Sequence, residues 1–202
     1  VDAFAPGAKV IHVDVDPAEI SKVRKADIPI VGDAGAVLEQ LIFAMEHFLD
    51  TKPAPERREW FDTIRNWQEK YPLQYDQDPD GPIQQQYVIQ ELHRITGGDA
   101  IVVAGVGQHQ MWASQWWGFE RPNTWINSGG LGTMGYAIPA AIGAKAGAPD
   151  ELVVAFDGDG SFQMTMQELV TASTEGINVK IMVLNNQWLG MVKQWQKLFY
   201  NK

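Results

Sequence analysis

The amino-acid sequence predicts an α/β fold in which helices cover both faces of a parallel sheet. From residue 82 onward, short strand-like runs alternate with longer helix-like runs. The strand-like runs are apolar almost throughout, which is typical of strands that are buried on both faces. Ligands of such sheets bind beyond the carboxyl ends of the strands, so we expect a site there.

Residues 1–50 are expected to form the end of an α/β middle domain. Residues 9–17 predict a strand, because β-branched residues lead up to Pro17, and residues 29–31 predict a second strand. Asp33 is placed to cap a helix whose apolar residues recur at helical spacing. The sequence begins without Met and stops just after a helical pattern, so we expect it to be part of a longer protein.

A linker is predicted over residues 51–81, and a second domain, truncated at its carboxyl end, over residues 82–202. The linker starts with prolines at 53 and 55, carries a helix over 56–70 and ends in a loop rich in Pro, Asp and Gly. In the second domain, helices are predicted over 83–95, 132–145 and 162–175, and strands over 100–104, 124–127, 152–156 and 179–184. The helix over 132–145 is rich in Gly and Ala, which fits either tight packing or contact with a cofactor.

Composition excludes several classes of function. The 202 residues carry a formal net charge of −9, which argues against a nucleic-acid surface. The absence of Cys excludes disulfides, thiolate metal sites and cysteine nucleophiles. The longest apolar runs are far too short to span a bilayer. We therefore expect a soluble protein whose partners are small molecules, with neither nucleic acid nor membrane among them.

Two polar motifs follow neighbouring strands of the predicted sheet. Asp157-Gly158-Asp159-Gly160-Ser161 comes after one strand, and Asn185-Asn186 comes after the next, with 24 residues between Gly160 and Asn185. That spacing fits one crossover helix and one strand, and it brings Asp159 beside Asn186. A carboxylate, an amide oxygen and a main-chain carbonyl suit Mg²⁺, which takes its remaining ligands from phosphates and water. A Gly-Asp-Gly tripeptide alone is more often a simple turn, whereas the two motifs together predict a metal-bridged diphosphate.

The combined pattern resembles the motif of thiamine diphosphate enzymes. Four further segments narrow the resemblance to the acetohydroxyacid (acetolactate) synthase catalytic subunit, its carboxyl-terminal portion: residues 105–112, 127–135, 162–165 and 189–195. The resemblance implies that Gln108 and His109 bind the diphosphate, and that Asp159, Asn186 and the main-chain oxygen of Trp188 hold Mg²⁺. It further assigns to the cofactor site Gly158, Gly160, Ser161, Gly190 and Met191. A lone His after a strand is most often structural, and His12, His47 and His93 stay unassigned.

The resemblance also names residues beside the reacting atoms. Met134 would be an apolar wedge that holds the cofactor in its bent form, although a Met at such a position is otherwise a core residue. The main-chain carbonyl of Gly132 would accept the cofactor's amine, and Val106 completes these catalytic positions. Met191 and Trp195 would contact the substrate, with Trp195 recognising the second 2-oxo acid; at this helical spacing, core packing is the alternative.

The first fifty residues resemble the second half of a domain that binds FAD in this family. Asp14 and Asp33 would then be FAD contacts, and solvated strand ends are the alternative interpretation. The family's catalytic Glu lies on a separate domain, usually of a neighbouring subunit, and is missing from this sequence. We therefore expect this chain to be inactive by itself.

The resemblance implies that the whole protein decarboxylates pyruvate and condenses it with a second pyruvate or with 2-oxobutanoate. The products would be 2-acetolactate and 2-aceto-2-hydroxybutanoate, intermediates of branched-chain amino acid biosynthesis. The resemblance also implies a homodimer or tetramer of catalytic subunits, and a small regulatory subunit is possible. The expected compartment is the cytoplasm, or the plastid if the source is a plant or alga. The alternatives are another thiamine diphosphate enzyme, such as pyruvate oxidase or glyoxylate carboligase, and a scaffold module without chemistry.

Overall fold

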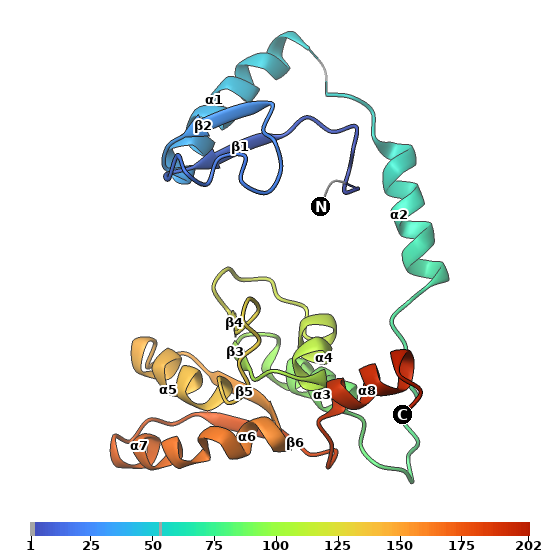
Figure 1. Ribbon diagram of the computed structural model, residues 1–202, viewed down its shortest axis with the longest axis vertical. Helices are drawn as coiled ribbons and strands as arrows, with labels where there is room; N and C mark the ends of the chain where they lie inside the picture. The colour runs from blue at the N-terminus through green and yellow to red at the C-terminus, as the bar shows by residue number, and fades with distance from the viewer. Residues whose placement is uncertain (1–2, 53) are drawn as a thin grey trace. The chain divides into compact units, whose positions relative to one another are not determined.

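The computed structural model describes residues 3–52 and 54–202 (Figure 1). The chain divides into two compact units, Val1–Pro72 and Leu73–Lys202, and the boundary falls inside the predicted linker. Pro53, one of the two prolines that begin that linker, lies outside the described residues. Within the described parts of the chain, no helix is both long enough and apolar enough to cross a membrane.

The first unit contains two parallel strands, β1 (Ile11–Asp14) and β2 (Ile28–Val31), and two helices, α1 (Ala34–Thr51) and α2 (Arg58–Lys70). The predicted cap of α1 is confirmed, because the Asp33 carboxylate accepts a hydrogen bond of 2.9 Å from the Ala36 N–H. β1 is shorter than predicted. Its end follows from Asp14, whose carboxylate accepts from the Asp16 N–H at 2.9 Å and turns the chain.

The second unit is built on a parallel sheet with the strand order β4-β3-β5-β6. Its strands are β3 (Ile101–Ala104), β4 (Trp125–Asn127), β5 (Val153–Gly158) and β6 (Lys180–Leu184). The two long strands pair from Val154 opposite Lys180 to Gly158 opposite Leu184. The predicted parallel sheet is confirmed, and the carboxyl ends of all its strands lie at the same edge.

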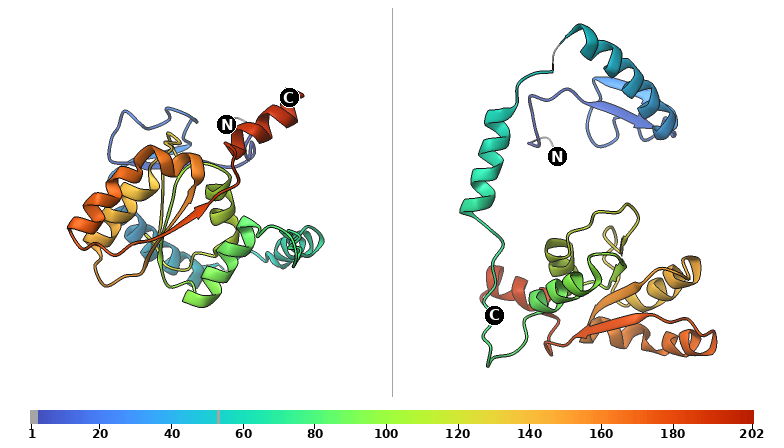
Figure 2. Two further views of the ribbon diagram at one scale, coloured as in Figure 1. Left: turned by 90° about the horizontal axis from the view of Figure 1, so that it is seen from below. Right: turned by 180° about the vertical axis from the view of Figure 1, so that it is seen from behind.

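Helices cover both faces of this sheet, as predicted. One face carries α3 (Gln85–Thr96) and α4 (Gln108–Trp116); the other carries α5 (Ala137–Gly147), α6 (Asp159–Thr165), a 3₁₀ turn η1 (Met166–Glu168) and α7 (Leu169–Thr174). The left view of Figure 2 shows the green and orange helices on opposite sides of the strands. The last helix, α8 (Gly190–Phe199), follows β6 at the carboxyl edge.

Alternation along β5 divides the core into two halves. Val154 and Phe156 pack with Ile89 of α3 and Ala113 of α4, whereas Val153 and Ala155 pack with the alanines of α5. Successive side chains of a strand point to opposite faces, so one continuous apolar run fills both interfaces. This explains why the strand showed no polar alternation in the sequence.

Helix α5 begins five residues later than predicted. Gly132 and Gly135 adopt φ values of +67° and +82°, in the left-handed region that a helix cannot contain. The segment before α5 is therefore a loop. Within α5, Ala137 and Ala141 are fully buried against β3 and β5. The Gly- and Ala-rich stretch was expected either to pack tightly or to contact a cofactor. Tight packing applies to helix α5, whereas only the loop before it could contact a cofactor.

Helix α4 was not predicted, because its buried positions do not form an apolar stripe. They are His109 and Ala113, one polar and one small, at a spacing of one helical turn. The helix predicted over 162–175 differs in two ways: it begins at Asp159, and η1 interrupts it. Asp159, Gly160 and Ser161 therefore lie in the first turn of α6.

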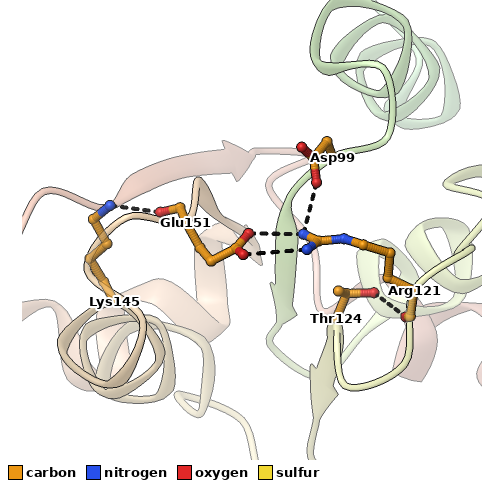
Figure 3. A network of polar contacts seen from close by, with 5 residues as sticks. All are labelled: Asp99, Arg121, Thr124, Lys145 and Glu151. Carbon is orange, nitrogen blue, oxygen red and sulfur yellow. Dashed lines mark hydrogen bonds and ion pairs between the residues drawn. The ribbon is translucent and has the colours of Figure 1, made fainter.

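An ion-pair network joins the amino ends of three strands, at the edge opposite the carboxyl ends (Figure 3). The Arg121 guanidinium lies 2.8 Å from Asp99 and 2.9 Å from Glu151. The Lys145 ammonium donates to the main-chain carbonyl of Glu151 at 2.6 Å. The Thr124 hydroxyl donates to the Arg121 carbonyl at 2.7 Å. Residues just before β3, β4 and β5 are thereby held together.

Candidate cofactor-binding site

A cavity of about 170 Å³ lies at the carboxyl edge of the second unit's sheet. Its walls come from the β3–α4 turn, the loop before α5, the β5–α6 junction and the segment that joins β6 to α8. Most of the site residues taken from the sequence line it: Val106, Gln108, His109, Gly132, Met134, Gly158, Asp159, Gly160, Ser161, Asn186, Trp188, Gly190 and Met191. Binding sites for small molecules usually have volumes of roughly 300–1,000 Å³. This cavity is smaller, so the described residues form only part of a small-molecule site.

Asp159 and Asn186 reach the cavity because they follow paired residues of adjacent strands. Gly158 pairs with Leu184, Asp159 comes one residue after the first, and Asn186 comes two residues after the second. The described residues contain no group of three or more His, Cys, Asp or Glu side chains that could hold a metal ion. A divalent ion here would therefore need further oxygen ligands from a bound small molecule, as Mg²⁺ does when it binds phosphate groups.

Hydrogen bonds fix the orientation of the Asn186 amide. Its oxygen accepts from the Trp188 N–H at 3.0 Å, and its nitrogen donates to the Gln108 side-chain oxygen at 3.4 Å. The nitrogen of Gln108 in turn donates to the Gln194 side-chain oxygen at 3.2 Å. An amide oxygen has two lone pairs, so the Asn186 oxygen keeps one for a cation.

A buried polar cluster stands behind the cavity wall. His109 is 5% exposed, Asp157 is fully buried, and 3.6 Å separates the His109 Nε2 from the nearer Asp157 oxygen. Burial lowers the pKa of His109 to about 4, so this imidazole is neutral at pH 7. Burial also raises the pKa of Asp157 to about 6, although hydrogen bonds from Ser161 and Gly158 work against that rise.

Glycines let the backbone pack closely around His109 and Gln108. A Cβ at Gly158 would lie 2.9 Å from the His109 Nδ1, and a Cβ at Gly190 would collide with the side-chain oxygen of Gln108. The His109 Nε2 and one Asp157 oxygen are buried and have no hydrogen-bond partner among the described residues. The cavity thus combines glycine backbone that no side chain covers, side-chain amides and a neutral imidazole. These groups suit an oxygen-rich ligand such as a diphosphate.

Met134 lies in the loop between Gly132 and Gly135, and it lines the cavity rather than joining a core cluster. The loop is attached to α6 at two points, one in its first turn and one at its last residue. The Gly135 N–H donates to the Ser161 hydroxyl at 2.9 Å, and the Thr165 hydroxyl donates to the Gly135 carbonyl at 2.7 Å. The Met134 side chain is therefore held over the β5–α6 junction, beside Gly160.

Three predicted site residues do not line this cavity. Trp195 is 55% exposed and packs on Phe199 with ring centroids 4.7 Å apart, so its substrate role stays a prediction. Asp14 and Asp33 belong to the first unit, where one oxygen of each makes a local turn or cap hydrogen bond. The alternative of solvated strand ends stays open, and the FAD contacts stay predictions.

The cavity also includes residues that were not predicted: Gln85, Gly107, Leu184, Leu189 and Val192. Leu189 and Val192 lie inside a segment that the sequence had marked, so their presence could have been foreseen. Gln85 could not, because it stands in a run of three glutamines at the start of α3 with nothing to distinguish it. Its side-chain oxygen is buried without a partner in the described chain. For Asp157 the sequence did contain one indication of a special role, because a carboxylate directly follows an apolar, buried strand run.

Family models match both parts of the chain. Residues 105–202 match the C-terminal TPP binding domain of thiamine pyrophosphate enzymes, and residues 1–41 match the central domain of the same enzymes. The first match contains nearly the whole cavity. The chain belongs to the thiamine pyrophosphate enzymes.

Within that class, the chain is similar to acetolactate synthase large subunits. It is 54% identical over 200 residues to the large subunit from Corynebacterium glutamicum, covering 99% of this chain and 32% of that protein. It is 48% identical over 198 residues to the isozyme 3 large subunit from Escherichia coli, covering 98% of the chain and 34% of the relative. It is 46% identical over 200 residues to acetolactate synthase 2, chloroplastic, from Nicotiana tabacum, covering 99% of this chain and 30% of that protein. The chain spans about a third of the length of these relatives.

Proposed function

We propose that this chain is the thiamine diphosphate-binding part of an acetolactate synthase. The whole protein would decarboxylate pyruvate and condense it with a second pyruvate or with 2-oxobutanoate. The observation that carries the proposal is the meeting of Asp159 and Asn186 in one cavity with Gln108 and His109. The identity of 44–54% to large subunits of acetolactate synthase supports the choice of reaction within the class.

Mg²⁺ fits the ligands that the chain offers. Asp159 supplies a carboxylate, Asn186 keeps a free lone pair on its amide oxygen, and the Trp188 carbonyl belongs to the same loop. Few protein oxygens and several phosphate oxygens are what Mg²⁺ prefers. Gln108 and His109 would then donate hydrogen bonds to the diphosphate, His109 in its neutral form.

Met134 and Gly132 would position the reactive part of the cofactor. The Met134 side chain would exclude an extended conformer, and the Gly132 carbonyl would be available to accept a hydrogen bond from an amine. When bound, thiamine diphosphate supplies the carbanion chemistry. The residues of this chain bind it and orient it, beside Val106. The catalytic Glu would come from a part of the protein outside this chain.

Further proposals concern the rest of the assembly. FAD would bind the domain to which the first unit belongs, with Asp14 and Asp33 as contacts, supported by the match of residues 1–41 to the central domain. The relatives from Corynebacterium glutamicum and Escherichia coli are large subunits, which supports a smaller regulatory partner and an oligomer such as a dimer or tetramer. The compartment would be the cytoplasm, or the plastid in a plant or alga.

A product assay on the full-length protein tests the proposed reaction. With pyruvate, thiamine diphosphate and Mg²⁺ we expect 2-acetolactate. Acetyl phosphate would instead identify a pyruvate oxidase, and tartronate semialdehyde from glyoxylate would identify a glyoxylate carboligase. A protein with no Mg²⁺-dependent affinity for thiamine diphosphate would be a scaffold module. Residues 190–195, which belong to the segment 189–195 that resembles the synthase family, favour the first outcome.

A further inference from the structure

The loop that carries Met134 is held by hydrogen bonds to both main-chain groups of Gly135. The Gly135 N–H donates to the Ser161 hydroxyl at 2.9 Å, and the Gly135 carbonyl accepts from the Thr165 hydroxyl at 2.7 Å. Ser161 lies in the first turn of α6, and Thr165 is the last residue of that helix. The two hydroxyls are about one helical turn apart, so they fix the peptide groups on either side of Gly135 at two separate points.

Gly135 approaches α6 closely because it has no side chain. Its φ is +82°, and a Cβ at this position would lie 2.9 Å from the Thr165 Cγ2 and 3.1 Å from the Met164 Cβ. Gly135 itself is buried. The backbone directly after Met134 is therefore packed against the helix as well as hydrogen-bonded to it, and a larger residue would push the loop away.

The Ser161 hydroxyl is engaged on both of its sides. It is 1% exposed, its oxygen accepts from Gly135, and its proton is donated to the carboxyl group of Asp157, which is fully buried at the end of β5. A hydroxyl has one proton to donate, so none is left for a phosphate. The hydrogen bonds of Ser161 thus connect β5 to the Met134 loop.

Thr165 does not line the cofactor cavity, whereas Met134 does. The terminal methyl group of Met134 lies 3.7 Å from the place that a Cβ of Gly160 would occupy, so the side chain rests on the first turn of α6. The same helix therefore supports Met134 at its start and holds the following residue from its last position.

We propose that Thr165 and Ser161 are positioning residues, which set the place of the Met134 side chain beside the bound cofactor. The inference rests on the proposed function, because the role of Met134 as a wedge belongs to that function. The two hydroxyls hold the loop before any ligand binds, so the wedge needs no rearrangement when the cofactor enters. Such preorganisation matters, because a misplacement of about 1 Å near the reacting atoms can cost roughly a hundredfold in rate.

Thr165→Val tests the proposal, because it removes the hydroxyl and keeps the shape of the side chain. In the cofactor-free full-length protein, we expect amide hydrogen exchange in peptides covering residues 132–136 to become roughly tenfold faster. In the holoenzyme, kcat should fall roughly tenfold or more. The Kd of pyrophosphate in the presence of Mg²⁺ should stay unchanged, since pyrophosphate has no ring for Met134 to contact. Thr165→Ser, which keeps the hydroxyl, should restore both loop exchange and kcat.

A double-mutant cycle separates positioning from a general effect on the fold. Thr165→Val should lower kcat in the unchanged protein and have no further effect in Met134→Ala, because the side chain that it positions is then absent. Thr96→Val is the matched control. The Thr96 hydroxyl also donates to a main-chain carbonyl, at 2.8 Å, but it does so at the end of α3. This control should leave loop exchange and kcat unchanged.

Unchanged loop exchange or unchanged kcat in Thr165→Val would overturn the proposal. An equal loss of kcat in the Met134→Ala background would do the same, as would a failure of Thr165→Ser to restore the lost values. Weaker binding of pyrophosphate with Mg²⁺ would assign the effect to the metal end of α6 instead. A failure of the proposed function would appear separately, as a different product in the assay above or as an unchanged kcat in Met134→Ala, whereas loop exchange is measured without the cofactor.

Discussion

At the scale of single residues, Asp159 and Asn186 carry the proposed metal bridge. Asp159→Ala or Asn186→Ala removes one oxygen ligand, while the apolar clusters of the core stay intact. We expect each variant of the full-length protein to lose Mg²⁺-dependent binding of thiamine diphosphate, by at least a hundredfold in Kd. Fluorescence titration with cofactor measures this. Asp150→Ala, in an exposed turn, is the control, and normal cofactor binding by both site variants would refute the assignment.

Site residues could be predicted where they form unbroken motifs after strands. Asp159 and Asn186 are of this kind, because strand-end position and residue type together determine their place. Trp195 is different: a helical residue four positions from Met191 can face a cavity or a neighbouring aromatic ring, and spacing alone cannot decide. Gln85 reaches the cavity only through the packing of α3 on the sheet, which sequence does not reveal.

At the scale of helices and strands, apolar runs predicted the elements well and backbone conformation set their ends. All the strands of the parallel sheet were expected, because runs such as residues 153–156 of β5 are apolar. The start of α5 was misplaced, since the sequence does not show which glycine adopts a positive φ. Helix α4 was missed because its buried residues are a histidine and an alanine, and neither contributes to an apolar stripe.

The network around Arg121 gives a pH-dependent prediction for these strand ends. Hydrogen bonding and charge attraction from Arg121 lower the pKa of Glu151 below its ordinary value of 4.5. A depressed carboxyl pKa contributes stability above 4.5, and this contribution is lost as the pH falls through the folded-state value. Arg121→Gln should therefore lower the unfolding midpoint at pH 7, with a difference from the unchanged protein that shrinks below pH 4.5.

Thermal unfolding of the full-length protein at pH 7 and at pH 3.5 checks this expectation. Both partners are partly exposed, so the shift should be modest and should weaken in high salt. Glu175→Gln, which removes a charge outside the ion pairs of the described chain, serves as control. A difference of the same size at both pH values would show that Arg121 acts through packing of its side chain and not through its charge.

At the scale of the whole molecule, the chain offers a cofactor site that is incomplete without its ligands. The described residues hold no group of three His, Cys, Asp or Glu side chains that could bind a metal ion. We therefore expect Mg²⁺ and the diphosphate to bind this site together and not separately. We expect the unfolding midpoint of the full-length protein to rise with both together and hardly at all with either alone. A ligand at a hundred times its Kd stabilises the folded state by about 2.7 kcal/mol.

Removal of the metal should reverse that rise. Added EDTA should return the midpoint to that of the cofactor-free protein, because the bridge between Asp159, Asn186 and the phosphates would be lost. Thiamine without its diphosphate is the matched ligand, and with Mg²⁺ it should give no shift, since it lacks the phosphate oxygens that would bind the metal. If Mg²⁺ alone raised the midpoint as far as Mg²⁺ and thiamine diphosphate together, the protein would supply a complete set of metal ligands. A bridging diphosphate would then no longer explain why Asp159 and Asn186 follow these two strands.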